Sequence, residues 1–356
     1  MNNVFKINNS KIGSNCPVYF IADIAANHDG NLDRAVALIN LAKDSGADAV
    51  KFQHHDVTKY VSDYGFKNLG DKQSHQKQWK KSIFEVYKDA EVPKSWSSTL
   101  AEHCNKINID FMSTPYDLDM VDHLDEYVPA YKIGSGDLAW DEMAIKILSK
   151  NKPIFIATGA STFEEVLHAH NLISSKTKNF CLMQCNTNYT GSIENFSYIN
   201  LNVLKLYKKN FPNTILGLSD HTPGHETVLG SIALGAKAIE KHFTDDTSRS
   251  GPDHPFSMDP DAWSKMVMSS RILEKAMGDG IKKVEKNEDQ TFILQRRAIR
   301  LIKDVSVNEV LKRDMLEFQR PCPKDALTPN SIKDILGKKT TKELKKGEHL
   351  TIKDIE

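Results

Sequence analysis

Two apolar runs that each end in a histidine decide the fold: Thr214-Ile-Leu-Gly-Leu-Ser-Asp-His221 and Ala236-Lys-Ala-Ile-Glu-Lys-His242. Both have the length and composition of buried β-strands, and a glycine-bearing helical stretch over 224–235 separates them. A strand–helix–strand order predicts parallel strands, so His221 and His242 reach the same rim of one sheet. Two imidazoles on one rim can bind a metal and leave positions open, as a catalytic site requires.

The same alternation of strands and helices extends from residue 18 to about 277. Eight strand–helix pairs in about 260 residues predict a closed (β/α)8 barrel rather than an open sheet. We predict strands over 18–26, 47–53, 109–114, 130–135, 153–158, 180–186, 214–220 and 236–243. We predict helices over 31–45, 93–106, 117–126, 141–150, 162–174, 196–209, 224–234 and 260–277.

Two stretches stand apart from this pattern. The polar stretch 54–92 follows the second strand on the active-site rim and carries Trp79, Tyr87 and many lysines. We expect it to be a lid or a sugar-side loop whose lysines form an exposed face. After a barrel over 1–277, the charged stretch 278–291 lacks an apolar stripe and is predicted to be a linker. Residues 292–356 then form a small unit of short strands and turns, whose core is marginal without another surface.

Composition excludes several classes of protein. Lys+Arg and Asp+Glu both total 47 in 356 residues, so no net field attracts nucleic acid or a membrane. No apolar run approaches the roughly 18 residues of a membrane span, and the first residues do not resemble a signal peptide. The five cysteines are scattered, which favours reduced thiols and a cytoplasmic location. Cys181 and Cys185 are four positions apart in one predicted strand, so they face the same side and are expected in the core.

Polar side chains gather where the predicted strands end. Lysines at strand ends are rarely buried unless they meet an anion, so Lys51 and Lys132 suggest a cradle for phosphate or carboxylate. The hydroxyls of Thr114, Ser135 and Ser219 would complete that cradle.

Each of these features also has a structural explanation. A single strand-end histidine is more often a hydrogen-bonded rim residue, a single lysine can be a rim charge, and Asp23 can simply pair with a neighbouring lysine. Five other histidines lie in predicted loops and are expected to be solvated: His28, His54, His55, His225 and His254.

Seven segments resemble the sialic acid (N-acetylneuraminate) synthase family, which includes related nonulosonic acid synthases. They run through the barrel in order: Ile21–Gly30, Gly46–Gln53, Ser113-Thr-Pro115, Tyr131–Gly136, Gly217–Thr222, Ile239–Thr244 and Arg249–Asp253. The tail, with Gln319-Arg-Pro321 at its turn, resembles the antifreeze-like (SAF) domain of that family.

The resemblance implies an activity and a set of site residues. Family members condense phosphoenolpyruvate with an N-acetylmannosamine-type sugar and release phosphate. The implied metal is divalent, most often manganese with magnesium or cobalt as alternatives, and is held by His221 and His242. Phosphoenolpyruvate would contact Lys51, Thr114, Lys132, Ser135, Thr187 and Ser219; the sugar would contact Gln53, Tyr189, Asp253 and Arg320; and Asp23, Lys51 and Lys132 would be catalytic.

The resemblance also implies a homodimer with exchanged C-terminal domains, in which Arg320 of one subunit reaches the sugar's acylamino group in the other. The sequence departs from the family pattern at four places. These departures leave the expected reaction class unchanged but bear on which sugar is bound. Asp23 replaces a glutamate, Ala157 a serine and Thr187 an asparagine, and the tail turn reads Arg320-Pro-Cys-Pro instead of Arg-Pro-Gly.

Two other functions stay open. A Schiff-base aldolase or lyase on a similar barrel would use a lysine and need no metal. A non-catalytic carbohydrate-binding protein would not need two strand-end histidines beside two strand-end lysines. Three sugars remain as candidate substrates: N-acetylmannosamine, its 6-phosphate and a 2,4-diacetamido-trideoxy hexose.

Overall fold

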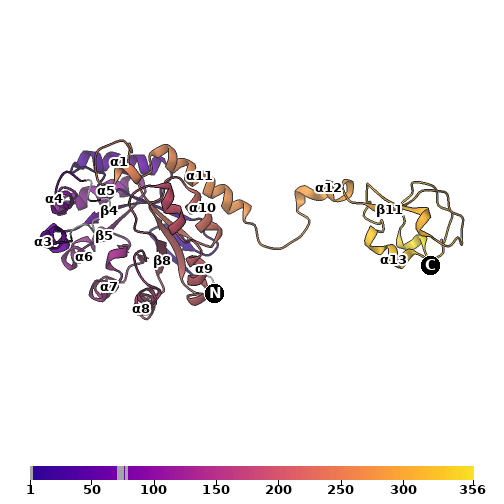
Figure 1. Ribbon diagram of the computed structural model, residues 1–356, viewed down its shortest axis with the longest axis horizontal. Coiled ribbons are helices and arrows are strands. Elements are labelled where there is room, and N and C mark those ends of the chain that lie inside the picture. The colour runs from indigo at the N-terminus through magenta and orange to yellow at the C-terminus, as the bar shows by residue number, and fades with distance from the viewer. Residues whose placement is uncertain (1–2, 70–75, 77–78) are drawn as a thin grey trace. The chain divides into compact units, whose positions relative to one another are not determined.

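Eight parallel strands close into a barrel, which confirms the predicted fold (Figure 1). The computed structural model describes residues 3–69, 76 and 79–356. Around the barrel the order is β10-β3-β4-β5-β6-β7-β8-β9, and every strand overlaps a predicted one. The strands are β3 Tyr19–Asp23, β4 Ala49–His54, β5 Asp110–Pro115, β6 Tyr131–Ile133, β7 Ile154–Ala157, β8 Phe180–Cys185, β9 Ile215–Asp220 and β10 Ala238–His242.

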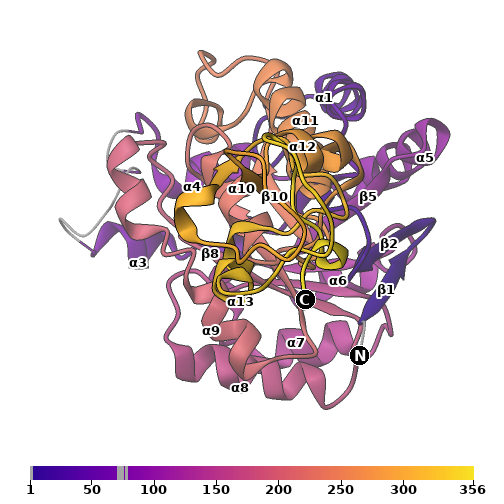
Figure 2. The same cartoon turned by 90° about the vertical axis from the view of Figure 1, so that its right-hand side faces the viewer.

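Eight helices follow these strands and ring the barrel (Figure 2). The predicted helix over 196–209 was wrong at its start: residues 193–198 form a 3-10 helix and α9 begins only at Val203. Asn200 separates the two because its φ of 50° is left-handed and cannot continue a helix. The helices are α1 Leu32–Asp44, α5 Ser97–Ile107, α6 Leu118–Leu124, α7 Asp141–Leu148, α8 Phe163–Ser174, α9 Val203–Asn210, α10 Glu226–Ala233 and α11 Pro260–Ala276. No helix of the described residues is long and apolar enough to cross a membrane.

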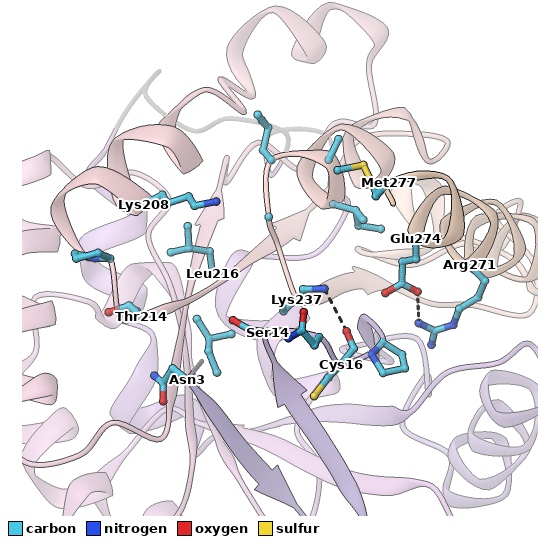
Figure 3. Close-up of a pocket in the computed structure, with 18 of the residues that line it drawn as sticks. Asn3, Ser14, Cys16, Lys208, Thr214, Leu216, Lys237, Arg271, Glu274 and Met277 are labelled. Carbon is cyan, nitrogen blue, oxygen red and sulfur yellow. Dashed lines mark hydrogen bonds and ion pairs between the residues drawn. The ribbon is translucent and has the colours of Figure 1, made fainter. Parts of the chain in front are cut away.

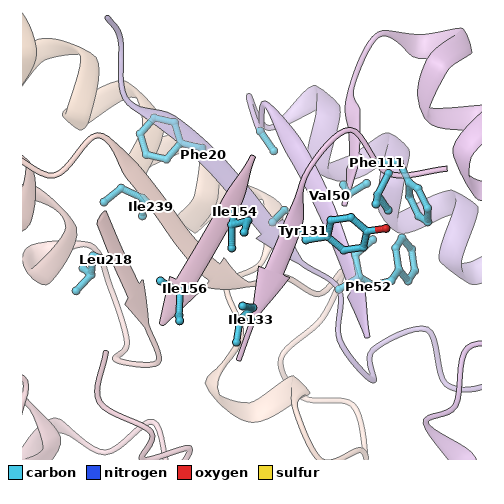
Figure 4. Packing of buried hydrophobic residues seen from close by; sticks show 14 of the residues in the cluster. Phe20, Val50, Phe52, Phe111, Tyr131, Ile133, Ile154, Ile156, Leu218 and Ile239 are labelled. Carbon is cyan, nitrogen blue, oxygen red and sulfur yellow. The ribbon is translucent and has the colours of Figure 1, made fainter. Parts of the chain in front are cut away.

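Side-chain parity divides each strand between two cores. Outward-facing residues pack against the helices, and Figure 4 labels several of them: Phe20, Val50, Phe52, Phe111, Tyr131, Ile133, Ile154, Ile156, Leu218 and Ile239. Inward-facing residues near the strand starts, such as Tyr19, Ala49 and Phe155, form a second apolar core. Further along the same inward faces the residues become polar, so the polar site lies at the carboxyl ends of the strands.

A hairpin that the sequence analysis missed adds to the inner core. It consists of β1 Val4–Ile7 and β2 Ser10–Gly13, which appear in indigo in Figure 2. Phe5, Ile7 and Ile12 belong to the inner core, and the ring centroids of Phe5 and Phe155 lie 5.8 Å apart. The hairpin therefore contributes to closing the end of the barrel opposite the site. The signal was the Asn8-Asn9 turn between two alternating runs.

The stretch 54–92 folds into short helices rather than one loop. These are α2 Val57–Tyr60, α3 Asp63–Lys67 and α4 Ile83–Asp89, packed around Val57, Val61 and Ile83. The described lysines of this stretch are exposed, as expected, whereas Lys72 and Lys77 lie outside the described residues. Buried free thiols at Cys181 and Cys185 agree with their predicted place in the core.

The expectation of solvated histidines was wrong for four residues: His28, His54, His55 and His254, all of which are buried. His225 is half-buried. His54 shows why a polar side chain is accepted here. Its Nδ1 lies 2.8 Å from Ser113 Oγ, and its Nε2 lies 3.1 Å from Ser97 Oγ. The ring thus ties β4 to α5 and β5, and burial lowers the pKa of His54 to about 3.

This burial makes His54 a source of acid sensitivity. The unfolded chain takes up a proton near pH 6.5 and the folded chain only near pH 3, so the stabilisation is present above pH 6.5 and is lost as the pH falls. Between pH 7.5 and pH 5 the loss is about 2 kcal/mol. In urea unfolding, the difference in free energy of unfolding between wild type and His54→Gln should be smaller at pH 5 than at pH 7.5 by about 2 kcal/mol. His103→Gln, at a half-buried histidine of α5, is the control. If the difference in free energy of unfolding between wild type and His54→Gln is the same at both pH values, the buried imidazole of His54 is not neutral.

Residues Asp279–Glu356 form a separate compact unit. After 279–285, which have no regular structure, come a 3-10 turn over 286–288 and α12 Asp289–Leu294. The strands β11 Ala298–Leu301 and β12 Leu316–Gln319 pair antiparallel, and α13 Ile332–Ile335 follows. The small core consists of Ile299, Leu301, Val305, Leu311, Met315, Leu316, Ile335, Leu344, Leu350 and Ile355.

Candidate active site in the barrel mouth

The two strand-end histidines, His221 and His242, lie side by side. The ring centroids of His221 and His242 are 5.3 Å apart. His221 Nδ1 lies 2.8 Å from the Asn186 carbonyl, which can only accept, so Nδ1 carries the proton and Nε2 keeps its lone pair. Burial lowers the pKa of both rings, to about 3 for His242, so both are neutral at pH 7.

These features fit a divalent metal. Neutral imidazoles are the metal-binding form, and a backbone carbonyl that fixes the tautomer is the usual support for a ligand. The Nδ1 atom of His242 is buried and has no hydrogen-bond partner among the described residues. Within the described part of the chain, no group of three or more His, Cys, Asp or Glu side chains is placed to hold a metal. His221 and His242 would therefore supply two ligands, with water and substrate oxygens as the others.

One buried ion pair, between the chain neighbours of the two histidines, joins the ends of β9 and β10. Lys241 Nζ lies 2.5 Å from Asp220 Oδ2 and donates to the Thr222 carbonyl at 2.6 Å. The hydroxyls of Thr222 and Thr227 also donate to Asp220 Oδ2, each at 2.8 Å. Because these residues are immediate neighbours of the histidines in the chain, the network holds the ends of β9 and β10 in one arrangement.

Lys51, on the inward face of β4, lies in a second buried ion pair. Its Nζ is 2.7 Å from Asp23 Oδ2 and donates to Thr114 Oγ1 at 3.3 Å. Burial alone would lower the pKa of Lys51, but the carboxylates of Asp23 and Glu240 raise it above its usual value. Burial alone would raise the pKa of Asp23, but Lys51 and then His242 hold it below its usual value. Lys51 therefore stays charged in the barrel mouth.

Lys132 lies in a third buried ion pair. Its partner, Glu240, was not among the predicted site residues. Lys132 Nζ is 2.6 Å from Glu240 Oε1, and the Ser219 hydroxyl donates to the same oxygen at 3.2 Å. Glu240 is buried and its Oε2 has no hydrogen-bond partner in the described residues. The signal was available, since Glu240 has the same strand parity as His242.

The remaining predicted contacts for phosphoenolpyruvate meet around Gly159. Its N–H donates to Ser135 Oγ at 3.0 Å. A Cβ at Gly159 would stand 2.6 Å from Thr187 Cγ2 and 2.9 Å from Ser135 Oγ, so only glycine allows these side chains to approach. The structure thus brings Ser135 and Thr187 together next to the buried Cys185, whose pKa burial raises to about 11.

Two predicted sugar contacts extend this polar group. Gln53 Nε2 donates to Asp23 Oδ2 at 3.2 Å, and Asp253 Oδ2 accepts from the Ala26 N–H at 3.1 Å. Asp253 Oδ2 also lies 3.8 Å from His242 Nδ1. Burial and the nearby Asp23 carboxylate raise the pKa of Asp253 to about 7. Asp253 can therefore exchange a proton near neutral pH.

His254, also missed, positions the loop that carries Asp253. Its ring contacts Thr244 Oγ1 at 2.7 Å and Asp29 Oδ1 at 3.0 Å. Arg34 crosses from α1 and pairs with Asp29 at 3.0 Å and with Asp245 at 2.6 Å. The loops after β3 and β10 are thereby fastened to each other.

A small cavity of about 110 Å³ opens beside these residues. Tyr189 borders it, with its ring centroid 4.3 Å from that of His221. Its described lining comes from two sources: Ala26, Gln53, Tyr116, Tyr189, His242, Pro252 and Asp253 from the barrel loops, and His55, Tyr60, Gln76, Trp79, Val86, Tyr87 and Ala90 from the 54–92 stretch. Arg320 belongs to the C-terminal unit, where it is exposed, and the structure does not place it relative to this cavity.

A larger cavity, about 990 Å³, lies at the other end of the barrel (Figure 3). Residues that precede strands line it, among them Pro17, Asp48, Thr214 and Lys237. Figure 3 shows Lys237 bonded to the Cys16 carbonyl and Arg271 paired with Glu274, so part of its charge is already neutralised. It contains none of the predicted site residues.

Known proteins resemble the chain over nearly its whole length. The family model described as "NeuB family" matches residues 38–282, and that described as "SAF domain" matches residues 296–356. An N,N'-diacetyllegionaminic acid synthase of Campylobacter jejuni is 34% identical, covering 92% of this chain and 97% of the relative. A pseudaminic acid synthase of the same species is 33% identical, with 94% and 95% coverage. The crystal structure of an N-acetylneuraminic acid synthetase from Leptospira borgpetersenii, in complex with citrate, is 28% identical and covers 82% of this chain and 95% of that one, with a TM-score of 0.71.

Proposed function

The chain belongs to the NeuB family, and from this premise we propose that it condenses phosphoenolpyruvate with a 2-acylamino hexose and water. The products would be a nonulosonic acid, such as N-acetylneuraminate, and phosphate. One observation carries the proposal. Two buried ammonium groups, each held by a carboxylate, lie in the same barrel mouth as two neutral imidazoles. Such a mouth suits a small anion that reacts with a polarised carbonyl.

Different residues of the chain would bind phosphoenolpyruvate, transfer protons and hold the metal. Lys51 and Lys132, with the nearby hydroxyls, would bind the phosphate and carboxylate of phosphoenolpyruvate and orient C3 toward the aldehyde carbon of the open-chain sugar. C3 forms the new bond, water adds to the cationic C2, and phosphate leaves by C–O cleavage. Asp253 can accept or return a proton on the sugar, since its pKa is about 7. A divalent metal, most often manganese, on His221 and His242 would supply Lewis acidity toward the aldehyde oxygen.

The lysines argue against the Schiff-base alternative. An amine nucleophile must be unprotonated, and such lysines usually have a depressed pKa. The carboxylates of Asp23 and Glu240 raise the pKa of Lys51 instead. Incubation with pyruvate and borohydride should therefore give no covalent adduct. Binding an uncharged carbohydrate does not require buried lysine–carboxylate pairs such as Lys51–Asp23 and Lys132–Glu240, which argues against a non-catalytic carbohydrate-binding protein.

Phosphate release tests the proposed function directly. The protein, supplied with manganese and phosphoenolpyruvate, is assayed with each of the three candidate sugars. Phosphate should appear only when a sugar is present, and a nine-carbon acid should form in equal amount. Failure of all three sugars, or phosphate release without a sugar, would contradict the proposal.

We further propose that two chains form a homodimer in which each C-terminal unit covers the barrel of its partner. Charge supports this arrangement. Residues 279–356 carry 18 basic and 14 acidic side chains, and residues 1–278 carry 29 basic and 33 acidic ones, so the two units have opposite net charges. The C-terminal core of ten buried side chains is also small enough to benefit from another surface. Arg320, exposed in its unit, would reach the sugar's 2-acylamino group with its planar fork.

Mixing two inactive variants tests whether the C-terminal units are exchanged between the subunits of the dimer. If Arg320 acts in the partner's site, a heterodimer of Lys51→Met and Arg320→Ala has one doubly defective site and one intact site. Random pairing should then restore about a quarter of wild-type activity. Each variant alone should stay inactive. Heterodimers that form but show no recovery would mean that Arg320 serves its own barrel or none.

A further inference from the structure

His221 lies just beyond the paired part of its strand. The pairing of β9 with β10 ends at Asp220, which lies opposite Lys241, and its pairing with β8 ends one residue earlier. His242, in contrast, is the last residue of β10 and is paired with Asp23 of β3. The sheet therefore fixes the backbone of His242 directly, whereas the backbone of His221 needs another support.

Lys241 holds both residues that flank His221. Its Nζ lies 2.5 Å from Asp220 Oδ2, on the residue before the histidine. The same ammonium donates to the Thr222 carbonyl, on the residue after it, at 2.6 Å. Because Lys241 also directly precedes His242, one buried side chain connects the backbones of both imidazoles.

The Asp220–Lys241 pair lies behind the histidines and not in the barrel mouth. Alternate residues of a strand face the same side, so Asp220 shares the side of Leu218, and Lys241 shares that of Ile239. Leu218 and Ile239 belong to the outer apolar core, between the strands and the helices. The pair can thus act on the site only through the backbone.

Stability alone does not account for an ion pair in this apolar core. Well-packed apolar side chains of similar volume are often at least as stabilising as a buried ion pair. Among the described residues Asp220 Oδ1 has no hydrogen-bond partner, and a buried acceptor of this kind costs free energy. The pair gives directionality instead, because Lys241 and the hydroxyls of Thr222 and Thr227 all donate to Asp220 Oδ2.

We propose that Lys241 and Asp220 are positioning residues that set the affinity of the barrel for its divalent metal. They keep His221 and His242, whose ring centroids are 5.3 Å apart, ready to bind one ion, so that metal binding need not order them. The inference rests on the metal of the proposed function and adds two residues that do not touch that metal.

Calorimetric titration with manganese, together with thermal unfolding, tests the proposal. Lys241→Met removes both bonds of the ammonium and should weaken manganese binding roughly tenfold or more. It also leaves the Asp220 carboxylate buried alone, so the melting temperature should fall. The double variant Lys241→Met with Asp220→Asn removes both charges. It should recover much of the melting temperature while manganese binding stays weak.

Lys237→Met is the matched control. Lys237 immediately precedes β10, and its ammonium donates to the Cys16 carbonyl at 3.2 Å, at the other end of the barrel. This variant should bind manganese with wild-type affinity. Destabilisation alone would reduce the number of binding-competent molecules and so the stoichiometry of the titration, whereas misplaced ligands reduce the affinity of each site.

The outcomes separate two failures. Wild-type manganese affinity in the double variant, or in a folded Lys241→Met variant, would mean that the pair contributes only to stability, which would overturn this inference and leave the synthase activity standing. A wild-type protein that binds no manganese would overturn the metal of the proposed function, and this inference with it.

Discussion

His221→Ala and His242→Ala are each expected to lower kcat/KM by about 100-fold or more, with the fold intact. Loss of a residue that merely supports a metal ligand commonly costs roughly 10–100-fold, so loss of a ligand should cost at least as much. The two imidazoles are neutral and adjacent, and among the described residues no group of three or more His, Cys, Asp or Glu side chains is placed to hold a metal. Calorimetric titration with manganese should show binding to wild type and none to either variant.

The control for the histidine variants is His225→Ala, which lies on the same rim at the start of α10 and is half-buried. It should bind manganese as wild type does. Chelation should abolish wild-type turnover and added manganese should restore it. Full activity in chelator, or unaltered manganese affinity in both alanine variants, would remove the metal from the mechanism.

Lys132→Met and Lys51→Met are expected to raise the KM for phosphoenolpyruvate at least tenfold and to leave the KM for the sugar nearly unchanged. A charge-assisted hydrogen bond contributes roughly 1.5–3 kcal/mol, which corresponds to about 10–150-fold in affinity. Both lysines are buried, so few other groups can replace them. Initial rates with each substrate varied in turn measure the two constants.

The ion pairs add a second, separable effect of these substitutions. Removing one partner of a buried pair costs about 3–5 kcal/mol, because the other charge stays buried alone. Lys132→Met should therefore also lower the melting temperature, and Lys132→Met with Glu240→Gln should recover much of it without recovering the affinity for phosphoenolpyruvate. An unchanged KM in both single variants would contradict the anion cradle. Recovery of affinity in the double variant would mean that Lys132 acts only as a structural partner of Glu240.

Residues placed by strand parity were largely predictable. β4 and β6 point Lys51 and Lys132 inward because alternate residues of a strand face the same side. Their closeness to Asp23 and Thr114, and that of His221 to His242, follows once the barrel closes. The same reasoning reaches Glu240, which shares its parity with His242 and was not included among the predicted site residues.

Residues placed by loops were not predictable in this way. His54, His55 and His254 stand next to turns and were expected in water, yet each is buried and hydrogen-bonded. Their partners, such as Ser97, Tyr87 and Asp29, are separated from them by 32 to 225 residues of chain. No local pattern encodes such a contact, because the loop is shaped by what it packs against.

The barrel, its polar rim and the residues that face that rim were predictable from the strand pattern, because hydrophobic periodicity and side-chain parity are properties of each strand. How those residues combine depends on the folded arrangement of the strands and loops. Folding paired Lys132 with Glu240 and Lys51 with Asp23, whose carboxylate raises the pKa of Lys51, and it packed the aromatic side chains of the 54–92 stretch together. Ionisation and pocket shape depend on neighbours that folding brings together, and the spacing of residues along a strand does not specify these neighbours.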